Sequence, residues 1–259
     1  MPRDQSHLNR RVPGDGPPRN QLLEPEVSLR ILERGNIESW EVMPWASNYT
    51  MCLLISSDEG SCLAVYKPRR GEAPLWDFPS GTLYRREYAS YLASQSLGWS
   101  FIPPTVIREG PYGVGSVPLY IETEPRADYF KFRGEHTAEL QRIALFDALA
   151  NNADRKAGHC LKGLDGRIWG IDQGLTFNSV HKLRTVIWDW AGKPIPKDML
   201  EELRAFQRQL SPKSALVNAL AKLIAEEEIE AARKRLSTLL STGIFPHPGP
   251  YRSVPWPVY

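Results

Sequence analysis

The sequence predicts an α+β protein with two lobes, a strand-rich N-terminal lobe and a helix-rich C-terminal lobe. Short alternating apolar segments separated by turn signals fill residues 27–123. From residue 137 the apolar positions change to helical spacing. A short hairpin is expected within the second part, with one aspartate just before it and another just after it. With 259 residues, 42% of them hydrophobic, the chain can bury a substantial core.

The N-terminal half divides into a lead and a lobe. Residues 1–24 are rich in Pro, Gly, Arg and Asn without a hydrophobic period, which predicts a disordered lead. The predicted N-terminal lobe covers residues 25–122 and contains one helix over Thr82–Leu97. Its strands are expected at Ser28–Leu32, Trp40–Met43, Thr50–Ile55, Cys62–Tyr66, Val106–Glu109 and Ser116–Thr123.

The predicted C-terminal lobe covers residues 123–243. Its first helix starts at Thr137, is apolar on most sides, and ends at an Asn-Asn pair. Ser211 is placed to cap a later helix that has Pro212 in its first turn. The tail over 244–259 is rich in Pro and aromatic residues and predicts an extended strap. The later helices are expected at Leu200–Leu210, Ser214–Ile224 and Glu226–Leu240.

Composition excludes several classes of protein. A net charge of +2 and a pI near 8.4 give no broad electrostatic footprint, so no nucleic-acid partner is expected. No apolar run approaches the roughly 20 residues of a membrane span, and the N-terminus lacks the apolar core of a secretory signal. Cys52, Cys62 and Cys160 are expected to be small core residues in a reducing compartment. A cytoplasmic location is therefore expected.

The segment Asn151–Arg155 places a carboxylate directly after a buried helix. Asp154 is a candidate catalytic residue, because its carboxylate can accept or orient the proton of an attacking hydroxyl. Asn152 is expected to brace the same loop, and Arg155 completes the candidate catalytic set. The alternative is an Asn-Asp turn held by local hydrogen bonds.

A second carboxylate, Asp172, lies 18 positions after Asp154 and precedes Gln173-Gly174. It follows an apolar segment, so it is expected to emerge from a buried strand into a glycine turn, where it can bind Mg²⁺ through oxygen. The hairpin formed by Cys160–Lys162 and Arg167–Gly170 brings both aspartates to one end. Kinase-like folds place a catalytic and a metal-binding aspartate in this way.

Two residues further upstream complete an ordered set. Lys67 lies where the apolar alternation of a predicted strand stops, and phosphoryl transfer needs a cation there to hold phosphates. Glu87 lies 20 residues later on the predicted helix and can pair with that lysine. Each residue alone is compatible with an ordinary solvated surface charge. The joint order of Lys67, Glu87, Asp154 and Asp172 is far more specific.

A polar turn lies between the first predicted strands. Ser47 and Asn48 fall there, where hydroxyls and backbone N–H groups can hold phosphates. The chain has no G-x-G-x-x-G or Walker A motif, and a plain polar turn is an equal alternative.

These motifs resemble the phosphatidylinositol 3-/4-kinase-related superfamily, which includes the type II phosphatidylinositol 4-kinases and the HipA-type kinases. In the type II phosphatidylinositol 4-kinases the catalytic segment reads Asn-x-Asp-Arg, to which Asn152–Arg155 is similar. Their metal-binding segment reads Ile-Asp-Asn-Gly-Leu-x-Phe, to which Ile171–Phe177 is similar. The segments Tyr66–Pro68, Pro74–Pro79 and Trp188–Gly192 look like a bacterial branch of that superfamily. The resemblance spans residues 28–210.

The resemblance implies a protein-kinase-like fold with ATP bound between the lobes and Mg²⁺ or Mn²⁺ as the metal. It assigns Lys67, Glu87, Asp154 and Asp172 to the roles given above. It also implies that the hinge against adenine is formed by Leu119, Tyr120 and Ile121.

His159 departs from the family pattern. Five positions after the catalytic aspartate the family has an asparagine that binds metal, whereas this chain has His159. Imidazole suits manganese and other transition metals better than magnesium. The open outcomes are catalysis with one metal or with manganese, an altered nucleotide pose, and a nucleotide-binding pseudokinase. A purely structural histidine is a further alternative.

The function expected from these observations is an ATP-dependent phosphotransferase that moves the γ-phosphate to a hydroxyl of a protein or small-molecule acceptor. A lipid acceptor is disfavoured, because no basic amphipathic or palmitoylation-type segment is present. The main alternative is a nucleotide-sensing module without turnover. A weaker alternative is an interaction scaffold that docks through the aromatic tail.

Overall fold

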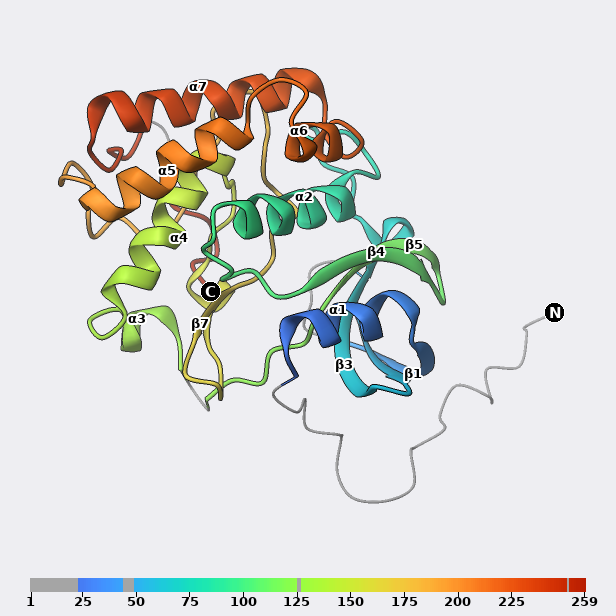
Figure 1. Ribbon diagram of the computed structural model, residues 1–259. Coiled ribbons are helices and arrows are strands. Elements are labelled where there is room, and N and C mark those ends of the chain that lie inside the picture. Colours follow the sequence, from blue (N-terminus) through green and yellow to red (C-terminus); the bar gives the residue numbers. More distant parts are fainter. Residues whose placement is uncertain (1–22, 44–48, 125–126, 251) are drawn as a thin grey trace.

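The computed structural model describes residues 23–43, 49–124, 127–250 and 252–259 (Figure 1). The predicted disordered lead therefore lies outside the described residues, apart from Leu23 and Glu24. Ser47 and Asn48, the candidate phosphate-binding residues, also lie outside them. Strands gather in the N-terminal lobe and helices in the C-terminal lobe, which confirms the α+β prediction.

The N-terminal lobe is built on a five-stranded antiparallel sheet with the order β1-β2-β3-β5-β4. Its central strands alternate between buried and partly exposed side chains, as expected for a sheet with one face on a core. Residues on the buried side include Met51, Leu53 and Ile55. The strands are β1 (Asn36–Val42), β2 (Met51–Ser57), β3 (Gly60–Pro68), β4 (Thr105–Gly110) and β5 (Gly113–Pro118).

The first element of this lobe is a helix, so the prediction of a strand at Ser28–Leu32 was wrong. Helix α1 spans Pro25–Arg34, with Ile31 and Leu32 fully buried in the core of the sheet. Short apolar runs fit a strand and a helix equally, and the terminal signals decide between them. Pro25 lies in the first turn and Arg34 in the last, as helix ends favour.

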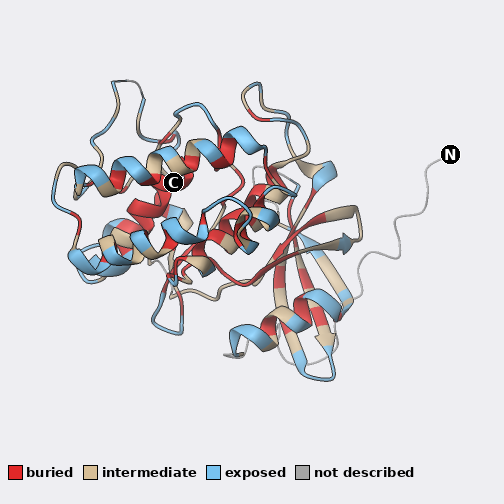
Figure 2. Ribbon diagram, turned by 45° about the horizontal axis from the view of Figure 1, so that its top comes forward, coloured by how far each residue is buried: buried red, intermediate tan, exposed pale blue. Residues whose placement is uncertain are grey.

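Helix α2 (Leu83–Ser96) lies between the sheet and the C-terminal helices (Figure 1). It is buried on most sides, so several of its polar side chains are in the interior, as the red segments of Figure 2 indicate. Arg86 is almost fully buried. Its guanidinium donates to the Thr176 carbonyl oxygen at 2.7 Å and forms an ion pair with Glu228 of α7 at 2.8 Å. This contact joins the two lobes.

In the C-terminal lobe, helix α4 contributes more buried residues to the core cluster than any other element does. The predicted hairpin is present, with Cys160–Lys162 (β6) paired to Ile168–Gly170 (β7). Short 3₁₀ turns occur at Arg69–Gly71 (η1) and Ala157–His159 (η2). The helices are α3 (Tyr129–Phe132), α4 (Thr137–Ala150), α5 (Lys197–Gln209), α6 (Ala215–Leu220) and α7 (Glu226–Thr242).

The cap predicted at Ser211 was wrong. Ser214 caps α6, and its hydroxyl accepts a hydrogen bond from the Val217 N–H at 3.1 Å. Lys213 has a φ of 65°, which interrupts helical geometry between Pro212 and Ser214. The Ser-Pro pair therefore lies in the preceding turn.

All three cysteines are free thiols, on strands β2, β3 and β6. Cys62 and Cys160 are buried in the core as predicted, whereas Cys52 is only partly buried. Burial raises the pKa of the Cys62 thiol to about 11 and that of the Cys160 thiol to about 12. Both therefore remain protonated at neutral pH. In the part of the chain that the structure describes, no helix has the length and apolar character to cross a bilayer.

Strands β3 and β5 pair over two residues only, Lys67 with Ser116 and Pro68 with Gly115. A Cβ added at Gly115 would lie 2.5 Å from the Lys67 carbonyl oxygen and 2.8 Å from the Pro68 Cα. The close approach of the two strands at Lys67 therefore requires glycine at position 115.

We expect Gly115→Ala to destabilise the fold by about 1–3 kcal/mol, because the added methyl group must push the backbone apart. Urea unfolding followed by circular dichroism measures this loss. Gly134→Ala is the matched control, since a Cβ there meets no atom within 4 Å. Equal stability of the two variants would show that β3 and β5 can separate freely.

Candidate functional site

Two cavities meet at Lys67 between the lobes. One, of about 340 Å³, is lined by the predicted hinge residues Leu119, Tyr120 and Ile121 and by apolar side chains from both lobes. The other, of about 200 Å³, contains Asp154. Lys67, Glu87 and Asp172 line both cavities.

Lys67, Glu87 and Asp172 form one ionic cluster. The Lys67 ammonium contacts the Glu87 carboxylate and donates to Asp172 Oδ1 at 2.9 Å. The second carboxylate oxygen of Glu87 accepts a hydrogen bond from the Gln173 N–H at 3.0 Å. The cluster therefore ties β3, α2 and the turn after β7 together. The pairing of Lys67 with Glu87 was left open by the sequence and is present here.

The cluster keeps its lysine and its aspartate charged. Burial alone lowers the pKa of Lys67, but the attraction of Asp172 and Glu87 is greater and holds that pKa above its ordinary value. Burial likewise raises the pKa of Asp172, but the attraction of the Lys67 ammonium more than offsets it, so that pKa lies below its usual range. Asp172 nevertheless keeps 44% of its side chain exposed to the cleft. A ligand can therefore reach an ionised carboxylate.

The backbone at Asp172 adopts a left-handed conformation with a φ of 59°. Such a conformation is costly for a residue other than glycine, so it persists only where the surroundings hold it. Hydrogen bonds on both sides do so: Ile171 N–H donates to the His159 carbonyl at 2.9 Å, and Gln173 N–H donates to Glu87. The turn thus presents Asp172 to the cleft at the expense of local strain.

Asp154 lies in the loop that follows α4. Its N–H donates to Asn152 Oδ1 at 2.9 Å, so Asn152 braces the loop. The Asp154 carboxylate is 27% exposed and lies 3.4 Å from the Lys156 ammonium. Burial raises the pKa of Asp154 to about 6; Lys156 opposes this and Asp172 adds to it. A carboxyl group with this pKa changes charge near neutral pH, as a proton acceptor requires.

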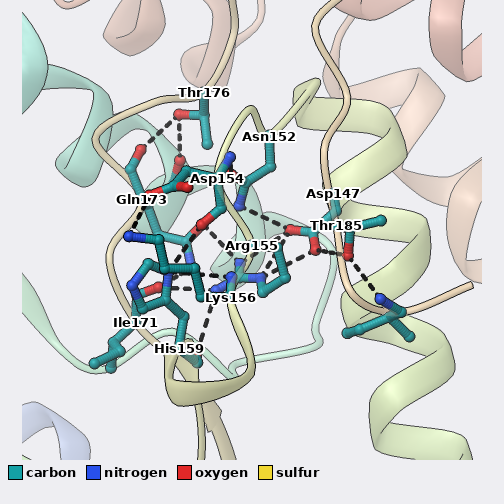
Figure 3. Close-up of polar contacts among 12 residues, drawn as sticks. Asp147, Asn152, Asp154, Arg155, Lys156, His159, Ile171, Gln173, Thr176 and Thr185 are labelled. Atoms are coloured by element: carbon teal, nitrogen blue, oxygen red, sulfur yellow. Dashed lines mark hydrogen bonds and ion pairs between the residues drawn. The ribbon is translucent and has the colours of Figure 1, made fainter. Parts of the chain in front are cut away.

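Arg155 and Asp147 form a fully buried ion pair at the base of this loop (Figure 3). The Arg155 guanidinium donates to both oxygens of Asp147, at 2.9 Å and 3.0 Å. Asp147 also accepts from Asn152 Nδ2 at 3.0 Å and from the Thr185 hydroxyl at 3.3 Å. The buried carboxylate is therefore well satisfied, as a buried charge must be.

The same guanidinium reaches the second aspartate segment. Arg155 donates to the Ile171 carbonyl at 2.8 Å and to Gln173 Oε1 at 3.0 Å (Figure 3). It thereby fixes the loop of Asp154 relative to the turn of Asp172. Arg155 was grouped with the candidate catalytic residues, but its full burial removes it from the cleft. It is a positioning residue.

His159 faces Asp172 from the end of the 3₁₀ turn η2. Its Nδ1 lies 2.9 Å from the Asp154 carbonyl oxygen, which can only accept, so we assign the ring hydrogen to Nδ1. The other tautomer would accept from the Lys156 N–H at 3.4 Å and donate from Nε2 to Asp172 Oδ2 at 3.3 Å, both longer contacts. With the hydrogen on Nδ1, Nε2 carries a lone pair 3.3 Å from Asp172 Oδ2. Burial lowers the pKa of His159 to about 4, so the ring is neutral at pH 7.

The three hinge residues differ in their free hydrogen-bonding groups. The Leu119 N–H donates to the Pro104 carbonyl at 2.8 Å, and the Tyr120 N–H donates to the Leu63 carbonyl at 3.0 Å. The Ile121 N–H has no partner within the residues that the structure describes. A ligand in the larger cavity can therefore bind at Ile121.

Sequence reasoning missed four residues around this site. Asp147 had a signal, because it is an acid in an otherwise apolar helical segment. Lys156 and Gln173 adjoin recognised motif residues, yet nothing in the sequence indicates where their side chains point. Tyr259 lines the larger cavity from the far end of the chain, and no local signal predicts this.

The arrangement defines the fold class. The chain has a protein-kinase-like fold: the Golgi casein kinase crystallised with Mn/ADP matches it with a TM-score of 0.53, at 15% sequence identity, over 84% of this chain and 74% of that one. A likeness at this identity establishes the fold alone. No known family model matches the sequence.

Sequence comparison then gives the family. The chain belongs to the family of protein Rv2133c from Mycobacterium tuberculosis, with 39% identity over 249 residues. That match covers 83% of this chain and 89% of the relative.

We expect Arg155→Met to lower the free energy of unfolding by about 3–5 kcal/mol, because it leaves the Asp147 carboxylate buried without its cation. Adding Asp147→Asn should recover part of that loss. Arg30→Met is the matched control at an exposed ion pair with Glu59, where the side chains are 45% and 42% exposed and the loss should stay below about 1 kcal/mol. Urea titration measures all three. Equal losses at the two sites would contradict the positioning role.

We expect Asp154→Asn to stabilise the metal-free protein above pH 6. The folded-state pKa of about 6 exceeds the ordinary value of 3.8, so ionisation of Asp154 opposes folding. This penalty is absent below about pH 4, grows between pH 4 and pH 6, and is complete above pH 6, where removing it should yield about 3 kcal/mol. Melting temperatures measured with a chelator across this range test the trend. Asp58→Asn, at an exposed position, is the control. A melting-temperature difference between Asp154→Asn and the wild type that does not change with pH would contradict the prediction.

Proposed function

We propose that this chain is an ATP-dependent phosphotransferase, a kinase that moves the γ-phosphate of ATP to a hydroxyl group of a protein or small-molecule acceptor. One observation carries the proposal. Lys67 pairs with both Glu87 and Asp172 at the junction of two cavities, and Asp154 lines one of them. A cation, a helix carboxylate, a candidate base and a candidate metal ligand, in this order along the chain, constitute the parts that kinases use.

The larger cavity suits the nucleoside part of ATP. Its volume of about 340 Å³ falls within the range of small-molecule sites. Val65 and Ile171 offer apolar surface to a purine ring, and the Ile121 N–H can donate to a ring nitrogen. Lys67 lies where the polyphosphate would extend toward Asp154. The Lys67 ammonium can hold the α- and β-phosphates there.

The reaction follows from the placement of Asp154. An acceptor hydroxyl in the smaller cavity attacks the γ-phosphorus, its new O–P bond forms as the bond to the β-phosphate oxygen breaks, and ADP leaves. The Asp154 carboxylate orients the hydroxyl and takes its proton. Asn152 and Arg155 hold the loop so that this carboxylate faces the cavity.

Two side chains fit a divalent metal. Asp172 Oδ2 and His159 Nε2 are 3.3 Å apart and both present lone pairs, so one ion can bind both. No group of three or more Asp, Glu, His or Cys side chains forms a metal site within the described residues. Phosphate oxygens and water would therefore complete the ligands. When bound, the ion would neutralise charge that develops on the phosphates. The imidazole ligand favours Mn²⁺ over Mg²⁺.

Two further observations support a nucleotide and a divalent metal. The Golgi casein kinase of similar fold was crystallised with Mn/ADP. The Asn-x-Asp-Arg and Ile-Asp-x-Gly motifs support a place in the phosphatidylinositol 3-/4-kinase-related superfamily. We propose that the family of this chain and protein Rv2133c belongs to that superfamily.

A nucleotide-binding pseudokinase is the second candidate. His159 favours it, because a neutral imidazole stands where related kinases have a metal-binding asparagine. In this case ATP binds between the lobes and controls conformation without turnover. The two candidates make different predictions for Asp154.

We expect ATP with Mn²⁺ or Mg²⁺ to raise the melting temperature, because a ligand that binds only the folded state stabilises it. Asp154→Asn should keep this shift and reduce ATP consumption by about 10²–10⁴-fold. Lys67→Met should lose most of the shift, whereas the exposed Lys222→Met should retain it. Thermal-shift assays, ATP turnover and intact-mass analysis for self-phosphorylation measure these effects.

The outcomes separate the candidates. Turnover lost in Asp154→Asn supports a kinase. Turnover that Asp154→Asn leaves unchanged contradicts the catalytic assignment, and a thermal shift without turnover in the wild type favours the pseudokinase. Absence of any shift with either metal would favour an interaction scaffold.

A further inference from the structure

The C-terminal strap, residues 252–259, runs along the loop that carries Asp154. The Val258 carbonyl accepts a hydrogen bond from the Ala157 N–H at 2.8 Å. The Ser253 carbonyl accepts from the Thr185 N–H at 3.0 Å and from the Trp188 indole N–H at 3.1 Å. Both ends of the strap are thus held by backbone contacts next to the site.

The segment under the strap is itself bonded to the catalytic loop. Arg155 N–H donates to the Arg184 carbonyl, and Val186 N–H donates to the Arg155 carbonyl, each at 3.0 Å. Residues 184–186 therefore lie between the strap and the loop of Asp154 and are hydrogen-bonded to both. The C-terminal end of the chain lies beside β7 in Figure 1.

These contacts bring the Tyr259 ring to the larger cavity, which it lines together with Lys156 and His159. Phe130 of α3 supports the ring on one side, with the two centroids 5.7 Å apart. The Tyr259 side of the cavity remains open, since that residue is 65% exposed. The ring is therefore a wall at the rim, and it does not fill a cavity that retains about 340 Å³.

We propose that Tyr259 is a nucleotide-positioning residue, and that the strap forms the outer wall of the nucleoside pocket. This inference rests on the proposed function. The position of Lys67 sets the orientation: it lies where the two cavities meet, so its ammonium attracts the phosphates toward the smaller cavity and leaves the nucleoside for the rest of the larger one. The face of an aromatic side chain can stack on a purine ring, and the hydroxyl of a phenol can hydrogen-bond a ribose hydroxyl.

The alternative role for Tyr259 is simple packing against Phe130. Packing alone predicts a change in stability and no change in affinity. The exposure of the ring favours a ligand-facing role, because an aromatic side chain that serves only packing is normally more buried. The nucleoside contact makes a prediction that packing does not, namely a weaker affinity only for ligands that contain the nucleoside.

The test compares binding of ATP, ADP, adenosine and inorganic tripolyphosphate to the wild type, Tyr259→Ala and Tyr259→Phe by calorimetry. We expect Tyr259→Ala to weaken ATP, ADP and adenosine by about tenfold and to leave tripolyphosphate unchanged. Tyr259→Phe should recover most of the affinity, because it keeps the ring. In turnover assays Tyr259→Ala should raise the KM for ATP and leave kcat unchanged. Trp256→Ala, an exposed aromatic residue of the same strap outside the cavity, is the matched control.

Each result decides between the possibilities. Equal binding of all ligands to Tyr259→Ala and the wild type overturns this inference and leaves the proposed function intact. Tighter ATP binding by Tyr259→Ala also overturns it, because the ring would then obstruct the pocket. A parallel loss of tripolyphosphate binding, or a similar effect of Trp256→Ala, would indicate a general disturbance and overturns it too. Failure of the wild type to bind ATP overturns the proposed function itself.

Discussion

The buried pair of Arg155 and Asp147 is the interaction on which the site depends. An isolated charge in the interior is costly, so the guanidinium and the carboxylate must be held together with all their hydrogen bonds satisfied. Once satisfied, Arg155 has donors left for the carbonyl of Ile171 and for Gln173. Two chain segments that each carry a candidate site aspartate are thereby fixed to one rigid group. The geometry between Asp154 and Asp172 therefore depends on a contact that is buried away from the cavities.

The site also places opposite electrostatic demands on its carboxyl groups. Asp172 is paired with the Lys67 ammonium and stays ionised, whereas Lys156 offsets the burial of Asp154 only weakly, so that Asp154 can take a proton. One environment suits a cation ligand and the other suits a base. The left-handed backbone at Asp172 and the burial of Asp154 both oppose stability. Such costs are common where function, and not packing, selects the residue.

Sequence alone was sufficient where a signal is local. The α2 helix, the β6–β7 hairpin and the order of Lys67, Glu87, Asp154 and Asp172 all follow from spacing and turn chemistry. Helix α1 was missed because a short apolar run fits either periodicity, and its decisive signals are the terminal Pro25 and Arg34. Local sequence signals could not predict that Arg155 is fully buried or that Tyr259 lines the larger cavity. Both depend on contacts between segments that are far apart in the chain, and neither composition nor periodicity encodes such contacts.

The ion pair between Arg86 and Glu228 bears on how the molecule is made. During synthesis α2 leaves the ribosome well before α7, and until Glu228 arrives the Arg86 guanidinium has no carboxylate partner in the position it later occupies. Burying it early would cost several kcal/mol, so α2 gains its final packing only late. We therefore expect the two lobes to fold as one cooperative unit, although their secondary structures differ.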